Sequence, residues 1–114
     1  MTNSKSITEA KVKVDIRAKL REWKALGRPI SWFWPLGGAF GKSGVEDLVL
    51  CVNGQYVAVE VKRPGGKLTP LQRTRRDAVQ QSNGIAICAR DVDYFIAVVE
   101  PLFDEPEGDS HAAR

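Results

Sequence analysis

Two apolar runs separated by Asn53-Gly54 constrain this chain more than any other feature. The runs cover residues 47–52 and 55–61. Asn-Gly between such runs is the strongest short-range signal for a β-hairpin with a two-residue turn. In that hairpin Asp47 faces Glu60, and a shift of one residue would move Asp47 to the other face of the sheet.

Facing carboxylates at the end of a hairpin need an explanation. Directly opposed side chains have Cβ atoms about 4.5–5.5 Å apart, and like charges placed so are destabilising. Strand alternation puts Lys62 on the same face as Glu60, while the other face of that strand is uniformly apolar. A divalent cation would remove the repulsion, because Mg²⁺ is commonly held by one or two carboxylates. The alternative is a surface ion pair of Lys62 with Asp47 or Glu60, which would contribute about 0–1 kcal/mol.

Two helices flank these runs in the sequence. Apolar residues recur at helical spacing over residues 7–26, and Ser6 with Glu9 fits a capping box at the start of this helix. A second helix is expected from Thr69, the predicted N-cap, to about residue 82, with Pro70 at its first position and Gln72 completing a capping box.

The remaining segments complete an α-β-β-β-α-β-α order. Residues 31–34 predict a short aromatic strand, 85–89 a buried strand, and 91–103 a last helix. The fold class expected is α/β, a mixed central sheet flanked by helices, in one domain over residues 1–103. Residues 104–114 form an acidic tail that is expected to be disordered.

Gly41-Lys42-Ser43 resembles a phosphate-binding loop, but the next segment is predicted as strand and not helix, so we expect no nucleotide cofactor. Trp32, Phe33 and Trp34 precede this loop. A core strand or dimer contact explains them better than stacking on unpaired bases.

Charge and composition narrow the function. Without residues 104–114 the chain has sixteen Lys or Arg against ten Asp or Glu, which is typical of a protein that binds a phosphate backbone. No apolar run approaches the roughly 18 residues of a membrane span, so we expect no membrane partner and a cytoplasmic location.

Cys51 and Cys88 lie in apolar runs and are expected to be buried free thiols. The lone His111, in the polar tail, argues against histidine-based catalysis.

Three segments resemble a known nuclease family. They are Gly44-Val45-Glu46-Asp47, Val59-Glu60-Val61-Lys62, and the run from Gly65 through Lys67 and Pro70 to Gln72. Together they look like the VRR-NUC (virus-type replication-repair nuclease) family of the PD-(D/E)XK nuclease superfamily. The resemblance covers residues 7–99 and is closest to the stand-alone phage and bacterial members. It implies a restriction-endonuclease-like core.

The resemblance implies roles for the matching residues. Asp47, Glu60 and the backbone carbonyl of Val61 would be metal ligands, and Lys62 would be the catalytic lysine. Glu9 would contribute to the metal site through water, and Gln72 would orient the site. Both also occupy the third position of a predicted capping box, which is an alternative explanation for each.

One residue departs from the family pattern. Glu46 stands where the family usually has proline, immediately before the aspartate. It either adds local negative charge or, in a shifted register, replaces Asp47 as ligand.

The expected activity is that of a Mg²⁺ or Mn²⁺-dependent endodeoxyribonuclease. The resemblance implies a homodimer that acts on branched DNA such as four-way (Holliday) junctions, in replication, recombination or repair of phage or bacterial DNA. Alternatives are a sequence-selective restriction-like or nicking nuclease, and a DNA-binding module without turnover. The residues expected to contact DNA are Lys42, Arg63, Lys67, Arg73 and Arg76.

Overall fold

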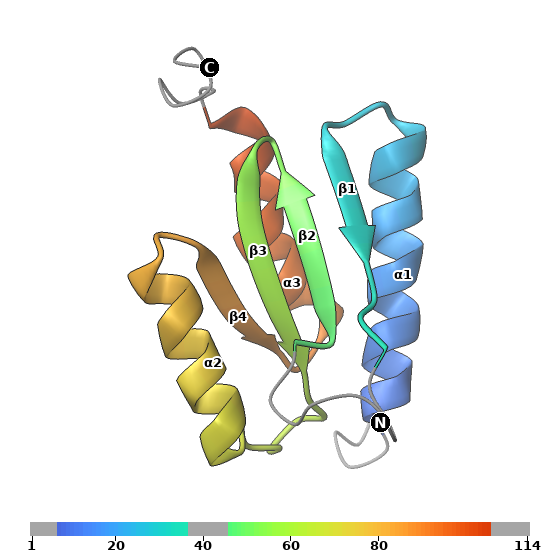
Figure 1. The fold of residues 1–114 in the computed structure, drawn as a ribbon. Helices are drawn as coiled ribbons and strands as arrows, with labels where there is room; N and C mark the ends of the chain where they lie inside the picture. Colours follow the sequence, from blue (N-terminus) through green and yellow to red (C-terminus); the bar gives the residue numbers. More distant parts are fainter. Residues whose placement is uncertain (1–6, 37–45, 106–114) are drawn as a thin grey trace.

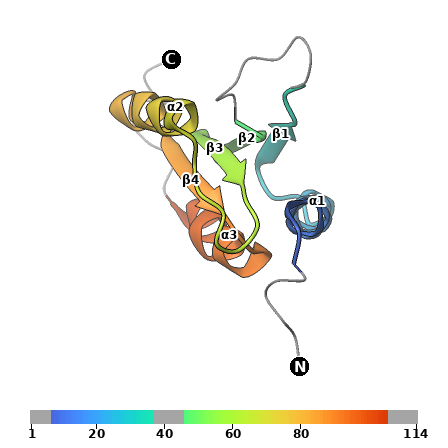
Figure 2. The same cartoon turned by 90° about the horizontal axis from the view of Figure 1, so that it is seen from below.

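The computed structural model describes residues 7–36 and 46–105. Four strands form one sheet in the order β1-β2-β3-β4: β1 (Ile30–Phe33), β2 (Leu48–Val52), β3 (Gln55–Val61) and β4 (Ile85–Ala89). The helices are α1 (Glu9–Ala25), α2 (Pro70–Gln81) and α3 (Val92–Val99), followed by the 3-10 helix η3 (Glu100–Asp104). Helices α1 and α3 lie on one face of the sheet and α2 on the other (Figures 1 and 2). The α/β class with a mixed sheet flanked by helices is confirmed.

The hairpin has the predicted turn and register. Asn53 and Gly54 have φ angles of 51° and 83°, both in the left-handed region, as the type I′ turn requires. Leu48 pairs with Val59, and the same register continued by one residue sets Asp47 opposite Glu60. Strand β1 is antiparallel to β2, whereas β4 is parallel to β3.

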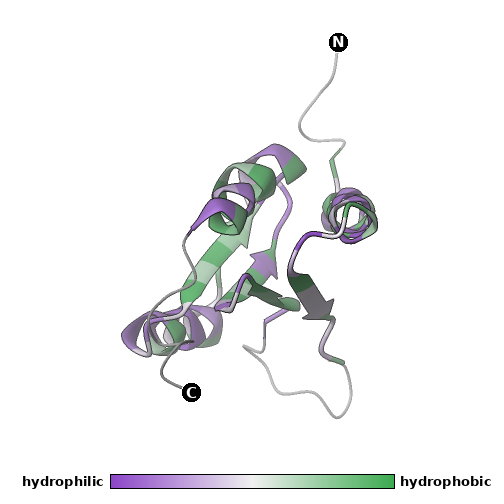
Figure 3. Cartoon of the chain, turned by 90° about the horizontal axis from the view of Figure 1, so that it is seen from above, coloured by the Kyte–Doolittle hydropathy of each residue, from purple (hydrophilic) through white to green (hydrophobic). Residues whose placement is uncertain are grey.

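The core lies between the sheet and the pair α1 and α3. Val57, Val59 and Val61 of β3 face it, and all three are fully buried, as expected from their alternating positions. Figure 3 shows hydrophobic residues along the strands between the helices. The main contributors from the helices are Ile16, Leu20 and Trp23 of α1, with Phe95 and Val99 of α3.

Helix α1 begins at a different cap from the one predicted. The Thr8 hydroxyl accepts a hydrogen bond from the Lys11 N–H at 3.0 Å, so Thr8 is the N-cap and Glu9 is the first helical residue. The capping box of Ser6 and Glu9 is therefore wrong, and Ser6 lies outside the described residues. Ile7 and Val12, which flank this start, both pack on the core, and such a hydrophobic staple favours Thr8 as cap.

The last helix is shorter than predicted. The α-helix ends at Val99, and residues 100–104 form the 3-10 helix η3. Pro101 has no N–H to donate to the preceding turn, which explains the change. Leu102 of η3 is still buried, and Phe103 packs edge-on against Trp23 with ring centroids 5.1 Å apart.

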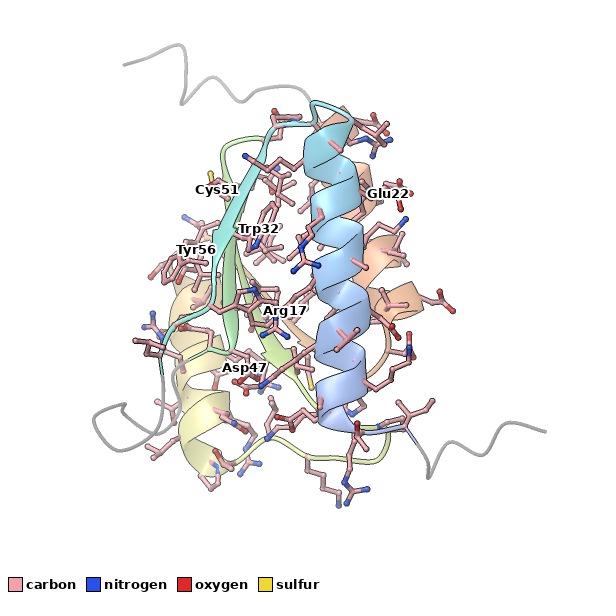
Figure 4. The ribbon with its side chains drawn as sticks, turned by 90° about the vertical axis from the view of Figure 1, so that its right-hand side faces the viewer. Arg17, Glu22, Trp32, Asp47, Cys51 and Tyr56 are labelled. Carbon is pink, nitrogen blue, oxygen red and sulfur yellow. The ribbon has the colours of Figure 1, made fainter. Side chains whose placement is uncertain are left out.

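The prediction of buried cysteines is wrong. Cys51 is exposed and Cys88 is partly exposed. The strand register places both on the α2 side of the sheet, with Tyr56 and Glu60 of β3. Helix α2 packs on β3 and β4 but leaves Cys51 of β2 uncovered (Figure 4). A five-residue strand looks uniformly apolar in sequence even when only its alternate residues reach the core.

The aromatic strand contributes to the core mainly through its tryptophans. Trp32 and Trp34 are partly buried and pack against it, while Phe33 on the other face of β1 is 58% exposed. The Arg17 guanidinium lies 4.3 Å from the centroid of Trp34. The core-strand interpretation therefore holds for the two tryptophans.

Candidate active site

The proposed site residues meet at one edge of the sheet. The start of α1, the start of β2, the end of β3 and the start of α2 all lie at the lower edge of Figure 1. Each strand end supplies a carboxylate there, Asp47 just before β2 and Glu60 near the end of β3. The two helix starts supply Glu9 and Gln72.

The backbone explains why Asp47 and Glu60 are so close. The Lys62 N–H donates to the Ala89 carbonyl of β4, so even-numbered residues of β3 direct their backbone groups to β4. Position 60 is therefore of the non-hydrogen-bonded type toward β2, in which opposed Cα atoms are about 4.5 Å apart.

The Asp47 carboxylate ends the ladder between β2 and β3. The Val61 N–H donates to Asp47 Oδ2 at 2.8 Å, so this side chain stands where a backbone acceptor would continue the ladder. N–H and C=O of one strand residue point to the same side. The Val61 carbonyl therefore points toward the Asp47 side, as a metal ligand at that position requires.

Glu60 is held in an environment that disfavours its charge. Its pKa is raised from 4.5 to about 9, first by burial, and then by a hydrogen bond to Asp47 and the negative charge of Asp47. The positive charge of Lys62 opposes this shift, and the charge of Glu9 adds to it. Without a cation Glu60 is thus protonated at neutral pH, and the two facing groups carry a single negative charge between them.

Gln72 serves the helix and the site at once. Its side-chain oxygen accepts from the Thr69 N–H at 2.8 Å, which completes the predicted capping box. Its Nε2 donates to Glu60 Oε2 at 3.0 Å. The two interpretations of Gln72, cap or site residue, are therefore compatible.

Lys13 was missed by sequence reasoning. Its Nζ lies 3.5 Å from Asp47 Oδ1 and 3.6 Å from Glu9 Oε2, so it links α1 to the start of β2. Figure 4 shows Asp47 between the sheet and the first turns of α1. The i, i+4 spacing of Glu9 and Lys13 predicts their ion pair, but nothing in the sequence indicates that Asp47 shares it.

Two alternatives raised by the sequence are not observed in the residues that the structure describes. One is a surface ion pair of Lys62, and the other is Glu46 in place of Asp47 opposite Glu60. Within the described residues Lys62 forms no ion pair, so the surface ion pair offered as an alternative is not observed there. Glu46 is 8% exposed and contacts Arg75 of α2 at 2.6 Å. The register places Asp47, not Glu46, opposite Glu60.

The donor set suits a hard divalent cation. Over residues 7–36 and 46–105 no group of three or more His, Cys, Asp or Glu side chains is arranged to hold a metal ion. Asp47, Glu60 and the Val61 carbonyl offer two carboxylates and one backbone oxygen, and Mg²⁺ commonly takes one or two carboxylates and keeps several waters. Glu9, paired with Lys13, fits a contribution through water better than a direct bond.

The basic residues predicted to contact DNA lie around this edge, except Lys42, which is outside the described residues. Arg63 and Lys67 are exposed in the loop after β3, and Arg73 is exposed on α2. Arg76, partly buried, lines a small pocket together with Glu60 and Gln72.

Arg90 fixes the loop after Lys62 and was also missed. The Gly66 N–H donates to the Arg63 carbonyl at 2.9 Å around Pro64 and Gly65, whose φ of 81° matches a type II turn. The Arg90 guanidinium donates twice to the Gly66 carbonyl, at 3.0 and 2.8 Å. Arg90 comes directly after β4, so the parallel pairing of β3 and β4 brings it beside this loop.

Comparison with family models, with curated proteins and with solved structures gave no match. None of the described helices is long and apolar enough to cross a membrane.

Proposed function

We propose that this protein is a Mg²⁺ or Mn²⁺-dependent DNA endonuclease with a restriction-endonuclease-like PD-(D/E)XK core. The observation that carries the proposal is the facing pair Asp47 and Glu60, in which the pKa of Glu60 is raised to about 9. An arrangement that holds a carboxyl group protonated beside a carboxylate is costly, and perturbed groups of this kind gather at functional sites. A divalent cation between them would make the arrangement favourable.

The fold supports the proposal. The α-β-β-β-α-β-α order around a mixed sheet agrees with the core that the family resemblance implies. The contacts suggest a role for each residue. Asp47, Glu60 and the Val61 carbonyl hold the cation, Gln72 orients Glu60, and Lys13 fixes Asp47 together with the Val61 N–H.

A bound cation would polarise the phosphodiester and lower the pKa of a coordinated water. Lys62, on the same face as Glu60 and without an ion pair in the described part of the chain, would stabilise negative charge that develops on the phosphate. The exposed side chains of Arg63, Lys67 and Arg73 around the site would contact the DNA backbone.

For the substrate we propose branched DNA, including four-way junctions, bound by a homodimer in the cytoplasm of a bacterial or phage-infected cell. A dimer provides two sites for two strands. The alternatives are a sequence-selective or nicking nuclease and a DNA-binding module without turnover.

Cleavage of a labelled four-way junction and of linear duplex, in Mg²⁺ and in EDTA, separates these functions. Symmetric cuts in the junction that require Mg²⁺ support the proposal. Cutting of linear duplex at one sequence favours the restriction-like alternative. DNA binding without cleavage in Mg²⁺ or Mn²⁺ would exclude both enzymes.

A further inference from the structure

An ion pair between the exposed Arg75 and the buried carboxylate of Glu46 ties helix α2 to the residue before Asp47. The Glu46 side chain is 9% exposed, and the Arg75 Nε donates to its Oε1 at 2.6 Å. The hydrogen bond and charge of Glu46 raise the pKa of Arg75. A carboxylate this well shielded from water needs a charged partner, and Arg75 provides it.

The start of β2 is consequently held at two neighbouring residues by different elements. Glu46 is bound by α2 through Arg75, while the Asp47 carboxylate accepts from the Val61 N–H of β3 at 2.8 Å. Asp47 itself precedes the first paired residue of the strand, Leu48. The backbone ladder alone therefore does not fix the Asp47 carboxylate, and the anchored neighbour restricts how the chain enters the strand.

The ion pair also controls charge near the site. Glu46 lines the same small pocket as Glu60 and Gln72. An unpaired Glu46 would place a further negative charge beside Asp47 and Glu60, which without a cation carry a single negative charge between them. Arg75 neutralises it there.

We propose that Glu46 and Arg75 are positioning residues for Asp47. Their ion pair sets the entry of the chain into β2, so that the Asp47 carboxylate faces Glu60 in the geometry that a divalent cation requires. This role rests on the proposed metal-dependent activity. It distinguishes two exposed arginines of α2 by their partners, because Arg75 is paired with the Glu46 carboxylate whereas Arg73 donates to the Leu68 carbonyl and, among the described residues, forms no ion pair.

The test is Mn²⁺ binding by the full chain in the absence of DNA, measured by titration calorimetry. We compare the unmodified protein with E46Q, R75Q, the double variant and the control R73Q, after circular dichroism shows which variants are folded. Removal of groups that orient metal ligands typically weakens metal binding about 10–100-fold. We expect a loss of about tenfold in E46Q and in R75Q, no further loss in the double variant, and no loss in R73Q.

A second measurement distinguishes positioning from general destabilisation. R75K keeps a cation beside Glu46, so it is expected to fold and to recover most of the Mn²⁺ affinity lost in R75Q. With DNA as substrate, E46Q and R75Q should lower kcat with KM unchanged, whereas R73Q should raise KM.

Two outcomes overturn the inference in different ways. If D47N loses Mn²⁺ binding while folded E46Q and R75Q keep it, the positioning role is wrong and the proposed function stands. If D47N binds Mn²⁺ as the unmodified protein does, the proposed metal site is wrong, and the positioning role falls with it. R75K that binds as weakly as R75Q, or R75Q that changes only KM for DNA, also contradicts the positioning role.

Discussion

At the scale of single residues, Glu60 is the group whose chemistry depends most on its surroundings. Its carboxyl is partly buried, receives a hydrogen bond from Gln72, and faces Asp47 across the hairpin. Burial and Asp47 both favour the protonated form, and Lys62 opposes them without reversing the shift. Protonation of Glu60 and binding of the proposed cation would therefore be competing ways to relieve the same repulsion.

The pKa of Glu60 predicts how stability depends on pH. Because the pKa rises from 4.5 in the unfolded chain to about 9 in the fold, the folded protein binds an extra proton between these values. The resulting stabilisation is complete below about pH 4.5 and is lost as the pH rises through about 9. In EDTA we expect the melting temperature of E60Q to fall less between about pH 5 and about pH 9 than that of the unmodified protein. Parallel melting curves for the two proteins would contradict the shift.

Substitution of Asp47 or of Lys62 is expected to abolish most of the DNA cleavage while the protein stays folded. In D47N the side-chain oxygen can still accept from the Val61 N–H, and K62A removes no ion pair of the described residues. We expect each to lower the cleavage rate by about 10²–10³ or more, because charge stabilisation and metal binding are lost. Rates of junction cleavage with gel-shift binding as the control check this. K62A that cleaves at the unmodified rate would remove Lys62 from the site.

At the scale of elements, the start of α2 links helix formation to the site. One side chain, Gln72, both completes the capping box with Thr69 and donates to Glu60. The helix cannot shift along its axis without moving the partner of Glu60. The two functions can nevertheless be separated by substitution, because they use the oxygen and the nitrogen of the amide respectively.

The variants T69A and Q72E separate helix capping from the contact with Glu60. T69A removes the cap hydroxyl, keeps the contact with Glu60, and should lower the free energy of unfolding by about 1 kcal/mol while cleavage at a permissive temperature is retained. Q72E keeps an acceptor for the Thr69 N–H but loses the donor to Glu60, so cleavage should fall by at least about tenfold. Urea unfolding and cleavage rates measure the two effects. If Q72E cleaves normally, Gln72 is only a cap.

The ends of α1 and α3 show that local sequence signals and tertiary packing can place the end of a helix at different residues. Ser6 and Glu9 have the spacing of a capping box, but Thr8 caps α1 because Ile7 and Val12 then reach the core. Tertiary packing therefore decided which of two possible residues caps α1. At the end of α3 the local effect was decisive instead, because Pro101 ended the α-helix although the apolar pattern of the sequence continues beyond it.

At the scale of the whole molecule, the two ends of the sheet differ. The end that carries Asp47 and Glu60 also carries the basic loop after β3 and the start of α2 (Figure 1). The opposite end, where α1 meets β1, carries Arg28, which pairs with Glu100 at 3.3 Å and lies over the Phe103 ring. A DNA backbone is therefore expected to run along the first end.

The salt dependence of DNA binding tests whether DNA runs along the end of the sheet that carries Asp47 and Glu60. Each lost phosphate contact lowers the slope of log affinity against log salt concentration by about 0.9. We expect R73A and R76A each to reduce the slope by about this amount, and R28A to leave it unchanged. Fluorescence anisotropy with a labelled junction at several salt concentrations measures it. Equal effects of R28A and R73A would mean that α2 is not the DNA-binding face.

The sequence by itself determined the hairpin and its register. Asn53-Gly54 specifies the turn, the turn specifies the register, and the register sets Asp47 opposite Glu60 with Lys62 on the same face. The cap of α2 was also local, because Thr69, Pro70 and Gln72 act within one turn of helix. These predictions succeeded because they depend on short-range backbone geometry.

Only the tertiary structure decided which distant groups surround the pair. Lys13 reaches Asp47 because α1 packs on β1 and β3, the two strands that flank β2. Arg75 reaches Glu46 because α2 covers the other face of the sheet. Arg90 reaches Gly66 because β4 runs parallel to β3. Such contacts join residues many positions apart, and the packing of apolar surfaces that creates them has no signature in the spacing of the charged residues themselves.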